Sequence, residues 1–257
     1  MSGVTVVKIG GSVLNGLDGY RRAAAWLAER AGAEPLVVVV SAEFGQTDAL
    51  LAQAASFSET PDADALDLLW STGELRSVAL LTLALRAEGV RAAGLNVHET
   101  GLHRRAPGAP VDLNPLSIRA ALSRHAIVVV PGFLATSRQR VVTLGRGGSD
   151  WSAVVLAAAL GASRCELIKD VAGYFTADPR VAGDARPIDH LDFDAAMRMA
   201  DEGCPLVQRQ ASEEAARANL PLVVRSFESH GSLVDAAPVA VHHSHITHHQ
   251  SQLPVCI

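Results

Sequence analysis

Short aliphatic runs alternate with amphipathic segments of helical spacing along this chain of 257 residues. The strand-like runs are Val4–Ile9, Leu36–Ser41, Val90–Val97, Ala126–Val130, Glu166–Lys169 and Leu220–Ser226. The helix-like segments are Asp18–Arg30, a stretch from about Asp48, Asp64–Arg86, Ser149–Leu160, Phe193–Glu202 and Ala211–Ala218. Such alternation favours right-handed βαβ units. We therefore expect an α/β three-layer sandwich, with helices on both faces of a central, mostly parallel sheet.

The remaining segments predict loops and one arm. Three prolines make Gly101–Pro115 a loop, Val171–Pro187 reads as a second long loop, and Arg138–Val142 fits a short hairpin arm. The chain has no internal repeat and no low-complexity linker, so we expect a single domain over residues 1–257. Its two lobes would cover roughly residues 1–140 and 141–257.

Composition excludes several classes of protein. Aromatic residues make up only 4% of a chain that is 49% hydrophobic, which predicts an aliphatic core. A net charge of −5 argues against a nucleic-acid partner, and no apolar run approaches the length of a membrane span. The first residues lead straight into a strand, without a signal peptide. The three widely spaced cysteines (Cys165, Cys204, Cys256) favour a reducing cytoplasm, where we expect Cys165 and Cys204 to be packing residues.

Lysine is rare in this chain: Lys8 and Lys169 stand against 20 arginines. Each lysine ends a strand-like run and lies beside a segment that fits phosphate binding. Because ligands of open α/β sheets bind at the carboxyl ends of strands, the two ammonium groups predict anion binding, and phosphoryl transfer in particular.

A glycine-rich segment, Thr143–Ala153, is the strongest local signal. Its glycines let the backbone approach a ligand closely, and Arg146 adds a planar fork that suits a carboxylate or phosphate. Ser149 or Asp150 is expected to cap the following helix, whose free amides attract anions, and Gly161 to end it. Taken alone, the segment also fits an ordinary glycine turn with a helix cap.

Three weaker segments point the same way. In Lys8–Ser12 a lysine precedes exposed amides, although a surface lysine before a turn fits as well, and no P-loop lysine follows the glycines. The polar segment Lys169–Arg180 would hold a nucleotide or its Mg²⁺, or be a plain surface loop. In Ser71–Glu74 a glycine interrupts a helical pattern at a cost of about 1 kcal/mol, which either a ligand near Glu74 or a helix break would explain.

Together and in this order, these segments resemble the amino acid kinase family, and within it the catalytic domain of aspartate kinases, over roughly residues 4–235. The resemblance rests on Leu144–Asp150, on Asp170-Val-Ala-Gly with Thr176–Arg180, on Ser71–Glu74, and on Val38–Ser41 followed by Thr47. It implies ATP-dependent phosphorylation of a carboxylate to an acyl phosphate, with Mg²⁺ bridging the β- and γ-phosphates. It also implies a small amino acid or carboxylic acid as acceptor and a homodimer.

By matching position, the resemblance assigns roles to individual residues. Lys8 would stabilise the transferring γ-phosphoryl group, and Asp150 would hold Lys8 in place. Arg146 would bind the substrate α-carboxylate and Glu74 its α-ammonium group. The other substrate-lining residues would be Ser41, Thr47 and Ser149. Among the nucleotide-binding residues, Gly10, Gly11 and Ser12 would offer hydrogen bonds to phosphate oxygens. The nucleotide itself, in the second lobe, would be bordered by Lys169, Asp170, Tyr174, Phe175, Asp178 and Arg180.

The sequence departs from the aspartate kinase pattern at several positions. Its first loop is Lys8-Ile-Gly-Gly-Ser-Val rather than Lys-Phe-Gly-Gly-Thr-Ser, and Phe175 stands where tyrosine is usual. Pro205 occupies the place of a lysine that helps bind ATP, and Lys169 the place of a threonine. We hypothesise that Lys169 replaces the missing lysine from the other side of the nucleotide. The alternative is that ATP binding has decayed.

After about Val234 only a short tail remains. We expect no feedback inhibition by lysine or threonine through C-terminal regulatory domains. The tail, residues 240–257, holds five of the ten histidines: His242, His243, His245, His248 and His249. They would bind a metal or an oligomer partner, or belong to a purely structural tail.

Three functions remain open from the sequence. The first is a kinase for L-aspartate or a close analogue. The second is a kinase of the same fold for another small acid or phosphate in a specialised pathway, and the third a non-catalytic binding or regulatory subunit.

Overall fold

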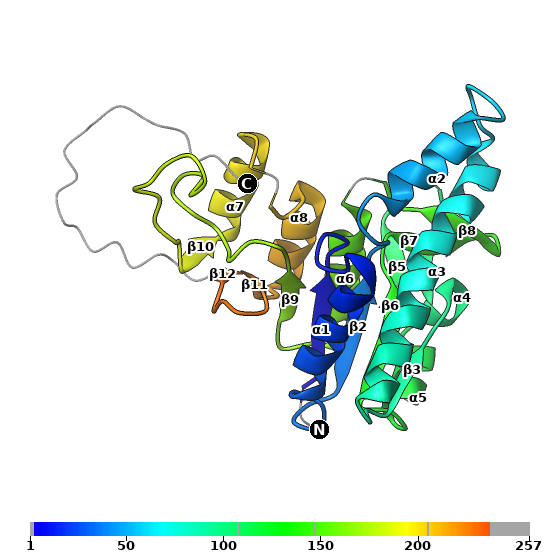
Figure 1. Cartoon of the computed structure of the whole chain (residues 1–257), viewed down its shortest axis with the longest axis horizontal. Helices are drawn as coiled ribbons and strands as arrows, with labels where there is room; N and C mark the ends of the chain where they lie inside the picture. Colours follow the sequence, from blue (N-terminus) through cyan, green and yellow to red (C-terminus); the bar gives the residue numbers. More distant parts are fainter. Residues whose placement is uncertain (1–2, 107, 146, 205, 237–257) are drawn as a thin grey trace.

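An eight-stranded sheet runs through the molecule in the order β10-β12-β11-β9-β1-β2-β6-β3 (Figure 1). The computed structural model describes residues 3–236 except 107, 146 and 205. Its strands are β1 (Thr5–Ile9), β2 (Leu36–Val40), β3 (Ala92–Gly94), β6 (Ile127–Pro131), β9 (Cys165–Ile168), β10 (His190–Asp192), β11 (Leu222–Arg225) and β12 (Ser232–Asp235). All neighbouring strands pair parallel except β11 and β12. The expected mostly parallel sheet is confirmed.

Helices cover both faces of this sheet. On one face α1 (Gly16–Ala28) and α3 (Ala63–Ala87) pack against one set of alternate strand residues, and α2 (Gln46–Ala55) lies against α3. On the other face lie α5 (Leu116–Leu122), α6 (Gly148–Leu160), α7 (Phe193–Asp201) and α8 (Arg209–Ala218). Because successive strand residues point to opposite faces, both sides of β2 are buried, which explains its uninterrupted Leu-Val-Val-Val-Val sequence. The three-layer sandwich is therefore confirmed.

A second, four-stranded sheet has the order β5-β4-β7-β8. Its strands are β4 (Leu102–Arg104), β5 (Val111–Leu113), β7 (Leu134–Ser137) and β8 (Arg140–Thr143). The hairpin arm predicted at Arg138–Val142 is thus present, but its first strand, β7, lies before the predicted range. The prediction of a loop at Gly101–Pro115 was wrong, because two strands of three residues each are too short to show a period of two.

Other boundaries also differ from the sequence prediction. Only Ala92–Gly94 of the predicted strand Val90–Val97 is a strand. Asn96 then caps a short helix, α4 (Val97–Thr100), by accepting hydrogen bonds from the backbone N–H groups of His98 and Glu99. Helix α5 and strands β10 and β12 were not predicted at all. The predicted roles of Arg146, Pro205 and the histidine-rich tail fall outside the described residues.

Helix α3 is long and apolar enough to fit a membrane span by length and composition alone. A helix of a folded core meets the same criteria, and 44% of the apolar window in α3 is buried inside the molecule. The finding is therefore weak support for a membrane segment.

A buried ion-pair network joins the amino ends of the central strands. Glu166 of β9 accepts two hydrogen bonds from Arg30, at 2.8 and 2.7 Å, and one from Arg164, at 2.8 Å. Burial opposes ionisation of Glu166, but the two guanidinium groups hold its pKa below the usual range. This carboxylate therefore ties α1 to the sheet.

We expect Glu166→Ala to lower the free energy of unfolding by roughly 2 kcal/mol, because two arginines would lose their shared partner in a largely buried site. Urea denaturation followed by circular dichroism measures the change. The control is Asp18→Asn, which removes an exposed pair with Arg21 and should cost less than about 0.5 kcal/mol. Equal losses in the two variants would contradict the structural role of Glu166.

Candidate functional site

Both lysines of the chain contact one carboxylate. Lys8 lies in β1, and Lys169 directly follows β9, its parallel neighbour in the sheet. The Nζ atom of Lys8 is 2.8 Å from Oδ1 of Asp150, and the Nζ atom of Lys169 is 2.7 Å from Oδ2. Asp150 reaches them from the first turn of α6, which packs on β1. Three segments far apart in the sequence thus place two ammonium groups on either side of one aspartate.

This Lys8–Asp150–Lys169 cluster is shielded from water. Lys8 is 6% exposed and Asp150 3%. Burial opposes the charge of Asp150, yet Lys169 and Lys8 together hold its pKa at about 2. Burial, with a smaller contribution from Lys169, lowers the pKa of Lys8 despite the attraction of Asp150. When both lysines are protonated the cluster carries one surplus positive charge in a site of low dielectric, which favours an anion beside it.

The turn after β1 adds backbone donors beside this cluster. Gly10 donates its N–H to Ile168 O at 3.1 Å, whereas the N–H groups of Gly11 and Ser12 find no acceptor within the described part of the chain. A Cβ on Gly11 would stand 2.3 Å from Ala42 O, so the turn requires glycine there. The exposed amides expected from the sequence are therefore present.

Helix α6 begins differently from the prediction. Its N-cap is Gly147, with φ 74°, and no side chain caps the helix. The expectation that Ser149 or Asp150 would cap it was wrong, because both lie inside the first turn, where Asp150 turns to the lysines instead. The stop at Gly161, with φ 67°, is confirmed. The N-terminal turn of α6 therefore has no side-chain cap, and the positive end of a helix dipole favours an anionic ligand.

A cavity of about 590 Å³ opens next to these amides, with Glu74 on its wall. Glu74 is 3% exposed, and its Oε1 accepts a 3.3 Å hydrogen bond from Ala42 N. Its Oε2 has no partner among the described residues. Burial raises the pKa of Glu74 to about 7. A buried carboxyl with an unsatisfied oxygen is well placed to bind a cationic group of a ligand.

The cavity unites most residues predicted to line the acceptor. Its lining includes Ser41, Thr47, Glu74 and Ser149. Gly11 and Ser12, which were predicted to bind the nucleotide phosphates, line the same cavity. It also contains three aromatic residues that the sequence reasoning missed: Phe44, Trp70 and Phe133. Trp70 donates its Nε1–H to Thr47 O at 3.3 Å and packs edge-on against Phe133 at 6.2 Å between ring centroids. The position of Phe133 just after β6, at a carboxyl strand end, was an available signal.

Close packing explains why residue 73 is glycine, a reason that the sequence did not suggest. Helix α3 is unbroken, so the alternative of a helix break was wrong. A Cβ on Gly73 would stand 3.0 Å from the Cβ of Ala42 and 3.3 Å from Cγ of Gln46. Glycine therefore lets α3 approach the loop after β2, and this approach brings Glu74 to the backbone of Ala42.

The residues predicted to border the nucleotide are placed less uniformly. Tyr174 is 1% exposed and belongs to the core, so its ring cannot border a ligand at the surface. Asp178 accepts hydrogen bonds from the backbone N–H and the guanidinium group of Arg180, at 2.8 and 3.3 Å. Asp170 is exposed and Phe175 half-buried. Only Lys169 of this loop contacts the Lys8–Asp150 pair.

The described residues contain no cluster of three or more His, Cys, Asp or Glu side chains that would hold a metal. Asp150 is engaged by two ammonium groups, which compete with a cation for its oxygens. The described side chains thus fit a metal that arrives with a phosphate ligand better than a resident one.

Glu74→Gln is expected to stabilise the protein by about 2 kcal/mol at pH 9 and by little at pH 5. The pKa of Glu74 is about 7 in the folded protein and near 4.5 in the unfolded chain. The stability contributed by protonated Glu74 is therefore fully present below pH 4.5 and is lost as the pH rises through about 7. Glutamine cannot ionise, so the variant keeps its stability as the pH rises. Urea denaturation at both pH values measures the difference, and Glu59→Gln, at an exposed residue, is the control. A pH-independent difference would contradict the buried carboxyl.

The fold and the site define an α/β protein in which a buried lysine–aspartate cluster at the carboxyl ends of parallel strands lies beside a cavity of about 590 Å³. Residues 3–226 match the model of the amino acid kinase family, and the chain belongs to this family. It is 38% identical over 238 residues to the aspartokinase of Thermus thermophilus, covering 90% of this chain and 59% of that protein.

Two solved structures are also similar. An aspartate kinase from Synechocystis is 34% identical, with a TM-score of 0.81, over 92% of this chain and 40% of that one. E. coli aspartokinase III in complex with aspartate and ADP is 25% identical, with a TM-score of 0.78, over 92% of this chain and 65% of that one. This chain therefore spans less than two thirds of the length of these three relatives.

Proposed function

We propose that this protein transfers the γ-phosphoryl group of ATP to the side-chain carboxylate of L-aspartate or a close analogue. The observation that carries the proposal is the Lys8–Asp150–Lys169 cluster beside a cavity whose wall holds Glu74. Similarity to E. coli aspartokinase III, which was solved with aspartate and ADP, supports the same ligand pair.

The cavity would hold the acceptor. The free oxygen of Glu74 would bind the α-ammonium group, and that added charge would keep the carboxyl ionised at neutral pH. Ser41, Thr47 and Ser149 would contact the rest of the acceptor. Arg146, by its sequence position, would bind the α-carboxylate. These contacts would fix the acceptor with its side-chain carboxylate toward the phosphate.

Phosphoryl transfer would follow from this placement. An oxygen of the acceptor carboxylate attacks the γ-phosphorus, the bond to the β–γ bridging oxygen breaks, and ADP leaves with that electron pair. Lys8 and Lys169 would offset the charge on the migrating group, and the amides of Gly11 and Ser12 would donate hydrogen bonds to its oxygens. Mg²⁺ carried by ATP would supply further charge neutralisation. The protein contributes position and charge rather than a covalent intermediate.

Asp150 would act as a positioning residue in this scheme. A pKa of about 2 keeps it ionised throughout the physiological range. Because each of its oxygens contacts a different lysine, it sets the spacing between the two ammonium groups.

A coupled assay of ADP release over a panel of amino and carboxylic acids, with hydroxylamine trapping of acyl phosphate, tests the proposal. A trapped hydroxamate with L-aspartate supports it. ADP and aspartate binding without turnover would instead indicate a regulatory subunit and reject the proposal.

A second acceptor is favoured by one observation. Phe44 is 72% exposed at the mouth of the cavity, and the partly exposed Leu51 lines the same cavity. An apolar mouth suits an analogue of aspartate with an apolar substituent. Turnover in the same panel with such a derivative, and not with aspartate, would support this alternative.

A further inference from the structure

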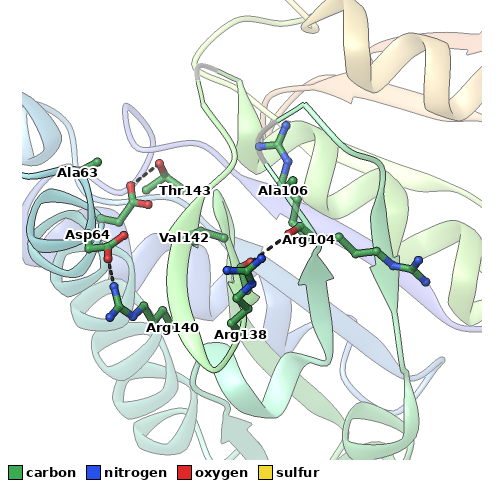
Figure 2. Close-up of a pocket in the computed structure, with 11 residues that line it drawn as sticks. Ala63, Asp64, Arg104, Ala106, Arg138, Arg140, Val142 and Thr143 are labelled. Atoms are coloured by element: carbon green, nitrogen blue, oxygen red, sulfur yellow. Dashed lines mark hydrogen bonds and ion pairs between the residues drawn. The ribbon is translucent and has the colours of Figure 1, made fainter.

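A second cavity, of about 620 Å³, lies between the start of α3 and the β7–β8 hairpin (Figure 2). Four arginines from two segments line it: Arg104 and Arg105 at the end of β4, and Arg138 and Arg140 at the hairpin. The proposed transfer reaction uses none of them.

The charges in this cavity are not balanced. Its two carboxylates are Asp64 and Asp67. Arg140 pairs with Asp64, as Figure 2 shows, and Asp67 accepts a 2.7 Å hydrogen bond from the hydroxyl of Thr143. Arg138 forms an ion pair with no carboxylate among the described residues.

The other two arginines on the wall are also only partly neutralised. Arg105 reaches Asp112 at 3.7 Å, and both side chains are largely exposed, which makes this pair weak. Arg104 donates its Nε–H to Ala109 O at 3.2 Å, lies 5.5 Å from the centre of the Trp151 ring, and pairs with no described carboxylate. The cavity therefore keeps surplus positive charge after its own contacts are counted.

The hairpin turn places two residues other than glycine in the left-handed region of the backbone. Ser137 pairs with Arg140, and the two residues between them, Arg138 and Gln139, have φ values of 47° and 67°. Two-residue turns of this left-handed form are normally Asn-Gly, which adopts it readily. Placing arginine and glutamine there costs on the order of 1 kcal/mol each, and such strain clusters at binding sites.

We propose that this cavity binds a small molecule with two or more phosphate or carboxylate charges. Guanidinium forks match the oxygens of such groups, and arginines on two segments would engage a multiply charged ligand better than a single small anion. Thr143 lines both this cavity and the acceptor cavity, and β8 leads directly into the glycine-rich turn. Binding here is therefore expected to change the apparent affinity for the acceptor.

The test is calorimetric binding of tripolyphosphate at low ionic strength without Mg²⁺, with ADP present to occupy the donor site. The key variant, Arg138→Asn with Gln139→Gly, is expected to bind roughly tenfold more weakly, because one charged hydrogen-bonding group is lost. The same variant should melt at a higher temperature, because it relieves the strained turn. The control, Arg21→Gln on α1, removes another exposed arginine, far from this cavity's lining, and should change neither value.

Weaker tripolyphosphate binding combined with an unchanged or raised melting temperature supports the site. A turn with a purely structural role would affect the melting temperature but not the binding. Tripolyphosphate binding by the variant equal to that of the wild type would overturn it. Enzyme kinetics then show whether the bound anionic groups belong to a separate effector or to the acceptor itself. A ligand that changes kcat or KM without competing with the acceptor is a separate effector, whereas competition indicates an anionic extension of the acceptor. Dependence of binding on Arg138 is decisive even if no acceptor is ever turned over.

Discussion

Lys8→Met is expected to lower kcat for acyl phosphate formation about 1,000-fold, with a much smaller change in the KM for the acceptor. Methionine keeps the length of the side chain but removes the charge from a site where Lys8 is 6% exposed. An ammonium group in such a dry site stabilises charge that moves in the transition state far better than bulk water does. The measurement is initial-rate kinetics with hydroxylamine trapping.

The fold should survive this substitution. Burial lowers the pKa of Lys8, which means that its charge is held there at a cost, and Asp150 keeps Lys169 as a partner. Circular dichroism and ADP binding on the same preparation check this. A kcat within tenfold of wild type in a folded, ADP-binding variant would exclude Lys8 from direct contact with the transferring group.

Much of the fold was predictable from local pattern. Aliphatic runs separated by helix-length segments predicted the central sheet and its two helical layers because strands buried on both faces are apolar throughout. Apart from the hairpin arm, the small second sheet escaped prediction because its strands have only three or four residues. Strand β12 was also missed, since it has only four residues, too few to show a clear period of two.

The part of the candidate site that lies at the ends of strands was predictable from the sequence. Lys8 and Lys169 terminate neighbouring parallel strands, so topology alone brings them to one edge of the sheet. The resemblance led us to expect the contact of Lys8 with Asp150. The contact of Lys169 with the same carboxylate was not foreseen, because it depends on how α6 packs across β1. The apolar wall formed by Trp70 and Phe133 was missed for the same reason: its residues come from different layers and share no local motif.

Tyr174 illustrates a limit of reasoning by position. The resemblance placed it beside the nucleotide, but the chain turns it inward, where its backbone N–H donates to Ser232 Oγ at 2.8 Å. Ser232 belongs to β12, the strand that was not predicted. A residue on a long loop cannot be assigned to a surface before the strand beneath it is known.

Lys169→Ala is expected to reduce kcat/KM for ATP about 100-fold, through both a higher KM for ATP and a lower kcat. The sequence hypothesis had Lys169 replacing a lysine that the family usually carries at the position of Pro205. The structure puts its ammonium group 2.7 Å from Asp150, on the opposite oxygen from Lys8. From there it would contact the same phosphate as Lys8, so binding and catalysis should both suffer. Steady-state kinetics with varied ATP separate the two effects.

The double variant Lys169→Ala with Pro205→Lys gives this prediction a sharper form. It restores a lysine at the usual family position while the strand-end lysine is absent. We expect its kcat/KM for ATP to be at least tenfold higher than that of Lys169→Ala. Pro205→Lys alone, which adds a third lysine to an intact pair, serves as the control and should not exceed wild type. If Lys169 only anchored Asp150, a lysine supplied from another segment would not reproduce its effect on KM for ATP. An unchanged KM for ATP in Lys169→Ala would reject the hypothesis that Lys169 replaces, from the other side of the nucleotide, the lysine that the family usually carries at the position of Pro205.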